Sequence, residues 1–471
     1  MRASVYLPLI AITSFALFLA LYRLGDPPLI DYDEATYAQV LHESIAHSNF
    51  FTFTKGGSPW IDKPPLSFLL MGASTAILGE DEFAMRLPAA LLTVGSIFLL
   101  WLIARRLTSD KITAFAASFI LATTLPFLEA GRQVRLDMGV VFSVLLATYC
   151  FLKSFDNKKW LLGFWTSIAF GFLFKSVLAF LAIIPITAVF SFTYRQWNWL
   201  KSRWFWAGAI LFLVIVIPWL LYQHSIYGPT FWQSFIGFQL RHLQPIIGEQ
   251  QAGYWYYVKI LLSVQPWINL FIISCVWLII TLPRSRQKIA SAVIVIFIFI
   301  FFEIAQSKLG YYLLPLYPFM ALSIALTLAP ILKNSSNYRT TARVLAIAIG
   351  IYAAASAVLN IQAPQKRDLL LRYSDAVTTR DIALDEKYIG KFLAREKIPV
   401  YLYKWPYHET LYYYGNAPEL ITVTQSKQPT DPPYFLVIPT DFVTSNQVRF
   451  NSVSVEFIYQ GPIGTLFRTK N

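Results

Sequence analysis

Long stretches without a charged residue constrain this chain more than any other feature. Three of them are Ser4–Tyr22, Trp204–Tyr222 and Ile260–Leu282. Each comes close to or exceeds the roughly 20 apolar residues with which a helix crosses a bilayer core. Hydrophobic residues make up 56% of the 471 residues and charged residues only 14%. A soluble protein of this length could not hide so much apolar surface, so the sequence predicts a polytopic α-helical membrane protein.

Eleven membrane spans are predicted. They lie near residues 4–24, 87–106, 112–130, 138–154, 159–175, 177–194, 204–224, 260–282, 288–305, 312–332 and 342–362. We interpret the first as a retained helix rather than a cleaved signal peptide. Val5–Tyr22 is longer than a usual signal-peptide core, and no clear Ala-x-Ala cleavage site follows it.

Basic residues collect in alternate loops, on the same side as Arg2. They are Arg105, Arg106, Lys111, Lys153, Lys158, Lys159, Arg195, Lys201, Arg203, Arg284, Arg286, Lys288, Lys333, Arg339 and Arg343. The positive-inside rule makes this side cytoplasmic. An odd number of spans then places the C-terminus outside, in a multi-pass protein of the cell inner (plasma) membrane. Because these residues orient the spans, the net charge of +13 does not indicate a nucleic-acid partner.

Two domains are predicted. Residues 1–362 form the transmembrane domain, with outward loops at 25–86, 131–137, 225–259 and 306–311. Residues 363–471 form a small extracytoplasmic α/β domain, because this part lacks another long apolar run. Its predicted elements are an amphipathic helix, Asp381–Lys397, and strands at Pro399–Lys404, Tyr434–Pro439 and Ser452–Tyr459.

The first outward loop carries Asp33 and Glu34 at the start of a helical stretch that runs to about His47. One such acid is explained by helix capping, since an N-terminal carboxylate accepts backbone N–H bonds and complements the helix dipole. A carboxylate at the membrane surface can also remove a proton from an acceptor hydroxyl. The local sequence leaves both roles open.

The same loop continues with Asp62-Lys63-Pro64-Pro65. The prolines suit the first turn of a helix. Lys63 lies on the side that the sorting rule disfavours for lysine, and a lysine beside a helix N-terminus can bind phosphate. A snorkelling interfacial lysine is the alternative.

Further polar residues fall in the other outward loops. Arg132 and Arg135 lie on the outward side. They indicate an anion or a carboxylate partner, and a structural Arg135–Asp137 pair is the alternative. Altogether the candidate catalytic residues are Asp33, Glu34 and Asp137, and the candidate substrate-binding residues are Asp62, Lys63, Arg132, Arg135, Arg241, Lys308 and Tyr312. An interfacial belt of aromatic residues with an anchoring lysine is the alternative for Lys308 and Tyr312.

The sequence predicts no metal ligand set. Cys150 and Cys275 lie inside apolar runs, and His42 and His47 are five residues apart rather than the four of a helical zinc pair. No cofactor is predicted, and a divalent metal is left open.

Cations that bind a phosphate and carboxylates that activate a hydroxyl, gathered on one membrane face, fit transfer of a group from a lipid phosphate. The phosphate leaves, so positive groups stabilise charge that grows in the transition state. A transporter or lipid flippase is the main alternative, but no repeated halves or paired broken helices are evident. A structural membrane protein would not need acids and cations on one face.

The order of these motifs resembles that of the GT-C glycosyltransferases of the protein mannosyltransferase and aminoarabinose transferase superfamily. The matching elements are Asp33-Glu34 with Tyr37-Ala38, Lys63-Pro64-Pro65-Leu66, Arg86 before the second span, Leu136-Asp137-Met138, and Lys308-Leu309 with Tyr312 and Leu314-Pro315. The resemblance covers roughly residues 1–330, and Asp62 stands where many relatives carry Glu.

The resemblance implies a GT-C fold, an outward cavity and an inverting displacement. It implies a sugar donor on a polyprenyl phosphate, such as undecaprenyl phosphate. The other implied partners are membrane lipids and a lipid, glycan or protein acceptor. It also implies Asp33 near the acceptor, Asp137 as the second acid, and donor-phosphate contacts from Lys63, Arg241 and Tyr312.

Overall fold

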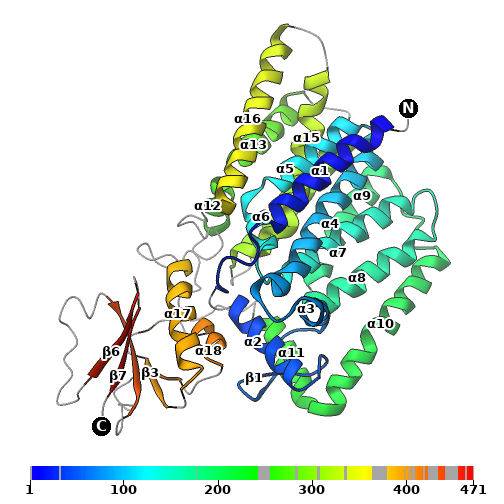
Figure 1. The fold of residues 1–471 in the computed structure, drawn as a ribbon. Coiled ribbons are helices and arrows are strands. Elements are labelled where there is room, and N and C mark those ends of the chain that lie inside the picture. Colours follow the sequence, from blue (N-terminus) through cyan, green and yellow to red (C-terminus); the bar gives the residue numbers. More distant parts are fainter. Residues whose placement is uncertain are drawn as a thin grey trace.

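A helical bundle and a small sheet-containing part make up the protein, shown as a computed structural model in Figure 1. The structure describes residues 3–30, 33–176, 178–241, 255–281, 285–304, 308–333, 337–362, 379–396, 398–402, 405, 409–416, 420–422, 433–440, 455–461 and 464–469. The N-terminus lies at one end of the bundle, and the sheet lies beyond the other end, where α18 (Glu409–Tyr414) lies next to α2 (Asp33–Ala46).

Each of the eleven predicted apolar stretches coincides with a helix or with two consecutive helices. They are α1 (Ala3–Leu21), α4 (Glu82–Thr108), α5 (Lys111–Ala122) with α6 (Leu125–Gly131), α7 (Asp137–Lys153), α8 (Trp160–Lys175), α9 (Leu178–Tyr194), α10 (Arg203–Tyr227), α12 (Tyr256–Ser263) with α13 (Trp267–Thr281), α14 (Arg286–Ile304), the 3₁₀ helix η1 (Gly310–Leu316) with α15 (Tyr317–Lys333), and α16 (Asn337–Gln362). The polytopic helical fold is therefore confirmed.

The lengths of these helices do not fix the number of spans. Among the described residues, five helices are long and apolar enough to cross a membrane, or up to seven if each of two bent pairs is one span. The α5–α6 pair bends by 67°, where Pro126 follows Leu125 at the start of α6 and has no N–H for the α5 ladder. Because the remaining apolar helices are shorter, the count of eleven stays a prediction.

The predicted outward loop 25–86 is itself folded. It holds α2 (Asp33–Ala46), a hairpin of β1 (Phe53–Lys55) and β2 (Ser58–Trp60), and α3 (Leu66–Leu78). Gly56 and Gly57 turn the hairpin with φ of 60° and 71°, values that favour glycine. Glu43 of α2 accepts hydrogen bonds from both glycine N–H groups, at 2.7 and 3.3 Å. The helix predicted to end near His47 is confirmed as α2, and the helix start predicted at Pro64-Pro65 is confirmed by α3.

Close packing of α7 against α8 sets the position of the polar residues at their ends. A Cβ atom built on Gly139 would lie 2.2 Å from the ring of Phe174, so only glycine allows this approach. The two helices follow each other in the chain through a short connection and run antiparallel. The first residue of α7, Asp137, therefore lies beside the last residue of α8, Lys175.

The C-terminal part contains a five-stranded mixed sheet in the order β4-β3-β5-β7-β6. The strands are β3 (Val400–Leu402), β4 (Leu420–Thr422), β5 (Phe435–Pro439), β6 (Val455–Gln460) and β7 (Gly464–Thr469). Strand β3 pairs in parallel with β4 and β5, and β7 pairs antiparallel with β5 and β6. Two helices accompany the sheet, α17 (Thr379–Leu393) and α18 (Glu409–Tyr414), and α17 buries Ile389 and Leu393 in the core of this part. The predicted α/β character is confirmed, whereas β4, β7 and α18 were not predicted.

Candidate active site

Asp33 begins α2 and pairs with Arg135 from the connection between α6 and α7. The Arg135 guanidinium donates to Asp33 Oδ2 at 2.6 Å. The side chain of Arg135 is 2% exposed, whereas that of Asp33 is 21% exposed. The pair therefore fixes the carboxylate from the protein side and leaves it accessible from the other.

Asp137 forms a second acid–cation pair with Lys175. The Lys175 Nζ donates to both carboxylate oxygens of Asp137, at 2.7 and 2.8 Å. Where the alternative predicted an Arg135–Asp137 pair, the structure has ion pairs of Arg135 with Asp33 and of Lys175 with Asp137. Lys175 was missed in the sequence, although it ends the apolar stretch 159–175 on the side that disfavours lysine.

The ring of Tyr311 lies between the cations of the two pairs. Arg135 Cζ is 4.7 Å and Lys175 Nζ 4.6 Å from its centroid, distances typical of cation–π contacts. Tyr312 is the next residue, and its ring centroid is 5.8 Å from Lys175 Nζ. Residues from four separate regions of the chain thus meet in one cluster.

Lys63 is buried just before α3, within the electrostatic field of this cluster. Burial first, and then the positive charge of Lys175, lower the pKa of Lys63 to about 8. The carboxylates of Asp62, Asp33 and Asp137 act in the opposite direction. The protonation of Lys63 is therefore sensitive to its surroundings, and a bound anion would favour its charged form.

Glu34 has a different environment from its neighbour Asp33. Its buried carboxylate accepts from Arg86 at 2.7 and 2.9 Å and from the N–H groups of Ile30 and Val134 at 2.8 and 2.9 Å. Arg86 also donates to the carbonyls of Leu24, Pro27 and Pro28. These contacts favour a role for Glu34 in holding the loop before α2, and its catalytic role stays a prediction.

Two other predicted substrate-binding cations have protein partners. Arg132 donates to the carbonyls of Leu19, Ala20 and Tyr22 at 2.7, 3.1 and 2.9 Å, near the C-terminal end of α1. Lys308 is buried and pairs with Glu303 at 2.9 Å. Neither set of contacts tests substrate binding.

Asp62 is half-buried beside Lys63. Arg241 is the last residue of α11 (Pro229–Arg241), but the placement of its side chain lies outside what the structure describes. Within the described part of the chain, no three His, Cys, Asp or Glu residues converge as a metal site would require.

An apolar cavity of about 450 Å³ opens near the cluster. It lies between α3, α8 and α10 and is lined by Phe51, Pro65, Leu66, Leu69, Leu173, Ile215, Pro218, Trp219 and Tyr222. Pro65 follows Lys63 by two residues, and Leu173 precedes Lys175 by two. The cavity therefore adjoins the two segments that supply these lysines.

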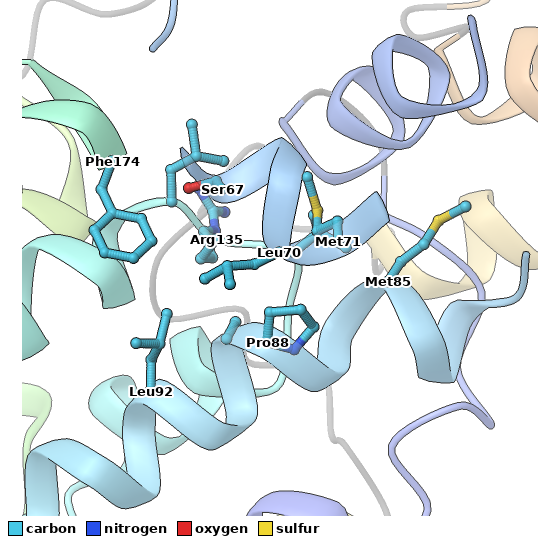
Figure 2. A pocket seen from close by; sticks show the side chains of 11 residues that line it. Ser67, Leu70, Met71, Met85, Pro88, Leu92, Arg135 and Phe174 are labelled. Atoms are coloured by element: carbon cyan, nitrogen blue, oxygen red, sulfur yellow. The ribbon is translucent and has the colours of Figure 1, made fainter. Parts of the chain in front are cut away.

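A second, much smaller cavity lies behind Arg135. Figure 2 shows Arg135 among Ser67, Leu70 and Met71 of α3, with Phe174 facing it from α8. Its volume of about 20 Å³ is enough for a single water molecule. The back of Arg135 is thus closely packed, which fixes the guanidinium against Asp33.

Comparison with known proteins shows similarity in part of the sequence and in the fold. A family described as dolichyl-phosphate-mannose-protein mannosyltransferase matches residues 62–222. The crystal structure of ArnT from Cupriavidus metallidurans bound to undecaprenyl phosphate superimposes with a TM-score of 0.71, at 18% identity, over 98% of this chain and 97% of that one. The chain thus has an ArnT-like fold, and part of its sequence is similar to the protein mannosyltransferase family.

Two sequence relatives show the extent of the match. An uncharacterized protein of Aquifex aeolicus (strain VF5) is 27% identical over 66% of this chain and 61% of its own length. The undecaprenyl phosphate-α-4-amino-4-deoxy-L-arabinose arabinosyl transferase 2 of Proteus mirabilis (strain HI4320) is 26% identical over 65% of this chain and 56% of its own. The match thus spans less than two thirds of these relatives.

Proposed function

We propose that the protein is a glycosyltransferase that moves a sugar from a polyprenyl-phosphate donor to an acceptor at the outer face of the membrane. The observation that carries this proposal is the cluster in which Asp33–Arg135 and Asp137–Lys175 meet over Tyr311. It combines an accessible carboxylate with buried cations, as transfer from a phosphate leaving group requires.

In this proposal the donor phosphate binds near Lys63 and Lys175. Both cations lie close enough for the charge of Lys175 to affect the pKa of Lys63. The first isoprene units occupy the adjacent apolar cavity, whose lining suits a hydrocarbon chain. Asp62, Arg132, Arg241, Lys308 and Tyr312 remain predicted substrate-binding residues.

The proposed reaction is a single inverting displacement. Asp33 accepts the proton of the acceptor hydroxyl as its oxygen forms a bond to the anomeric carbon of the sugar. The bond from that carbon to the phosphate oxygen breaks, and its electron pair leaves with the polyprenyl phosphate. Lys63 stabilises this charge as it grows, while Asp137 holds Lys175 toward the same region.

The orientation follows from the loop charges and is part of the proposal. The cluster and the C-terminal domain (363–471) face the outside of the cell inner membrane, opposite the basic loops. The transmembrane domain is residues 1–362. A donor of the kind named for the Proteus relative is the first to test.

The decisive experiment supplies the purified protein with a panel of labelled undecaprenyl-phosphate sugars and separates lipid, glycan and protein acceptors. We expect one label to move to one acceptor class, with release of polyprenyl phosphate, and Asp33→Asn to transfer it on the order of 10²–10⁴-fold more slowly. If no label is transferred but a labelled lipid crosses the bilayer of a proteoliposome, the transporter alternative replaces this proposal.

A further inference from the structure

The segment that leads into Asp33 is attached to the C-terminal part of the protein. The Leu29 N–H donates to the hydroxyl of Tyr414 at 3.0 Å, and the Thr410 hydroxyl donates to the Leu29 carbonyl at 3.3 Å. Both polar groups of the Leu29 backbone are thus bound by α18, although Leu29 precedes Asp33 by only four residues. Its side chain is fully buried in a core that Tyr414 also contacts.

Tyr414 connects this segment to the start of α4. Its hydroxyl donates to Glu82 at 2.7 Å while it accepts from Leu29. Glu82 lies in the first turn of α4 and also pairs with Lys387 of α17. Lys387 Nζ is 5.2 Å from the centroid of the Tyr414 ring. Two helices of the C-terminal part therefore converge on one carboxylate of the bundle.

The bundle holds the same segment from its other side. Arg86, one turn after Glu82, donates to the carbonyls of Leu24, Pro27 and Pro28. Residues 24–29 are therefore held between α4 and α18. All of these contacts come from the protein itself, so this part of the site is formed before a substrate binds.

We propose that Tyr414 is a positioning residue for Asp33, and that the C-terminal domain thereby forms part of the frame of the active site. This inference rests on the proposed function, since it assigns Tyr414 an effect on the carboxylate that takes the proton. Tyr414 acts through the Leu29 backbone and does not touch the reacting atoms. A carboxylate displaced by a fraction of an ångström to 1 Å attacks less well, while donor binding through Lys63 is unaffected.

The test compares Tyr414→Phe with Tyr413→Phe in the full-length protein. Tyr413 is a matched control, because it is adjacent and contacts the same core, but its hydroxyl bonds Glu80 and Met85 Sδ (3.9 Å) where that of Tyr414 bonds Leu29 and Glu82. We expect Tyr414→Phe to lower kcat about tenfold or more with an unchanged KM for the donor. Amide exchange in a peptide covering residues 24–37 should become faster in Tyr414→Phe and stay at the wild-type rate in Tyr413→Phe.

The outcomes separate this inference from the proposed function. Equal kcat and equal exchange in the two variants would overturn the role of Tyr414 and leave the proposed function standing. Faster exchange with an unchanged kcat would also overturn it, because the attachment would not set the rate. Faster exchange in Tyr414→Phe of a protein that transfers no sugar would support the attachment and reject the proposed function.

Discussion

Neighbouring acids in this protein have different environments because successive residues of a helix project about 100° apart. Asp33 faces Arg135 and remains partly exposed, whereas Glu34 turns into the protein and meets Arg86 and two backbone N–H groups. The sequence showed a pair of acids and predicted both as catalytic. The sequence could not distinguish them, because Arg135 lies about 100 residues from Asp33 and Arg86 about 50 residues from Glu34 in the chain.

At this scale the first prediction concerns Asp33→Asn. Asparagine retains the shape and most of the helix-capping capacity of aspartate but lacks its basicity. We therefore expect single-turnover transfer to fall on the order of 10²–10⁴-fold, while donor affinity is retained. Near-wild-type transfer would return Asp33 to a capping role and point to Asp137 or to an acceptor that is already ionised.

The second prediction concerns the pH dependence of donor binding. The pKa of Lys63 is lowered to about 8 by burial and by Lys175, against the carboxylates of Asp62, Asp33 and Asp137. The protonated form binds the phosphate, so affinity should be constant well below this pH and should decrease as pH rises through it. Equilibrium binding of a labelled polyprenyl-phosphate sugar, whose phosphodiester keeps one negative charge throughout this range, measures this profile.

Lys63→Arg provides the control, because a guanidinium stays charged throughout this range. Its profile should be flat where that of the wild type falls. An identical decrease in both proteins would assign the titration to another group and remove Lys63 from the donor site.

At the scale of elements, apolar length predicted the bundle well. All eleven predicted stretches coincide with helices or bent pairs, since backbone groups in lipid must be satisfied within a helix. The short α11 was not predicted, because its length of 13 residues is below that of a span, whereas the start of α3 was predicted from Pro64-Pro65. Lys175 was missed for a related reason: it becomes part of the site only through the contact of α7 with α8, which sequence periodicity does not show.

That contact gives the third prediction. Gly139→Ala places a methyl group against the Phe174 ring, so we expect a loss of about 1–3 kcal/mol in stability. Transfer should also decrease, because α8 carries Lys175 away from Asp137. Thermal unfolding in detergent and the transfer assay measure the two effects.

Gly237→Ala is the matched control within α11, where an added Cβ meets nothing within 4 Å. Alanine favours a helix more than glycine, so this variant should be as stable as the wild type or more stable. Equal destabilisation by both substitutions would show that the close approach of α7 and α8 is not the cause.

At the scale of the whole molecule, the sheet and the candidate site lie at the same end of the bundle (Figure 1). Lys55 of the β1–β2 hairpin pairs with Glu409 of α18 at 2.7 Å, which adds a contact between the outward loop and the C-terminal part. These long-range contacts were not predictable from the sequence, because both segments contain ordinary surface residues. The composition change near residue 363 predicted only that a separate α/β unit exists.

The fourth prediction concerns orientation in the membrane. Reporter fusions after Lys111, Lys201 and Lys333 should report the cytoplasm, because they follow the basic loops. Fusions after Gly57 and Asn471 should report the outside. A cytoplasmic C-terminus would contradict the eleven-span topology and would separate the sheet from the proposed site.

The two residues of the Glu34–Arg86 ion pair are not interchangeable, although their charges alone would allow an exchange. Arg86 satisfies three carbonyls in addition to the carboxylate, and Glu34 satisfies two backbone N–H groups in addition to the guanidinium. Exchanging the two residues would keep the total charge but would set a carboxylate against carbonyl oxygens and a guanidinium against N–H donors. We therefore expect the reciprocal double variant Glu34→Arg/Arg86→Glu to be no more active or stable than the weaker single variant. Relatives that vary this pair should then replace it as a unit rather than invert it.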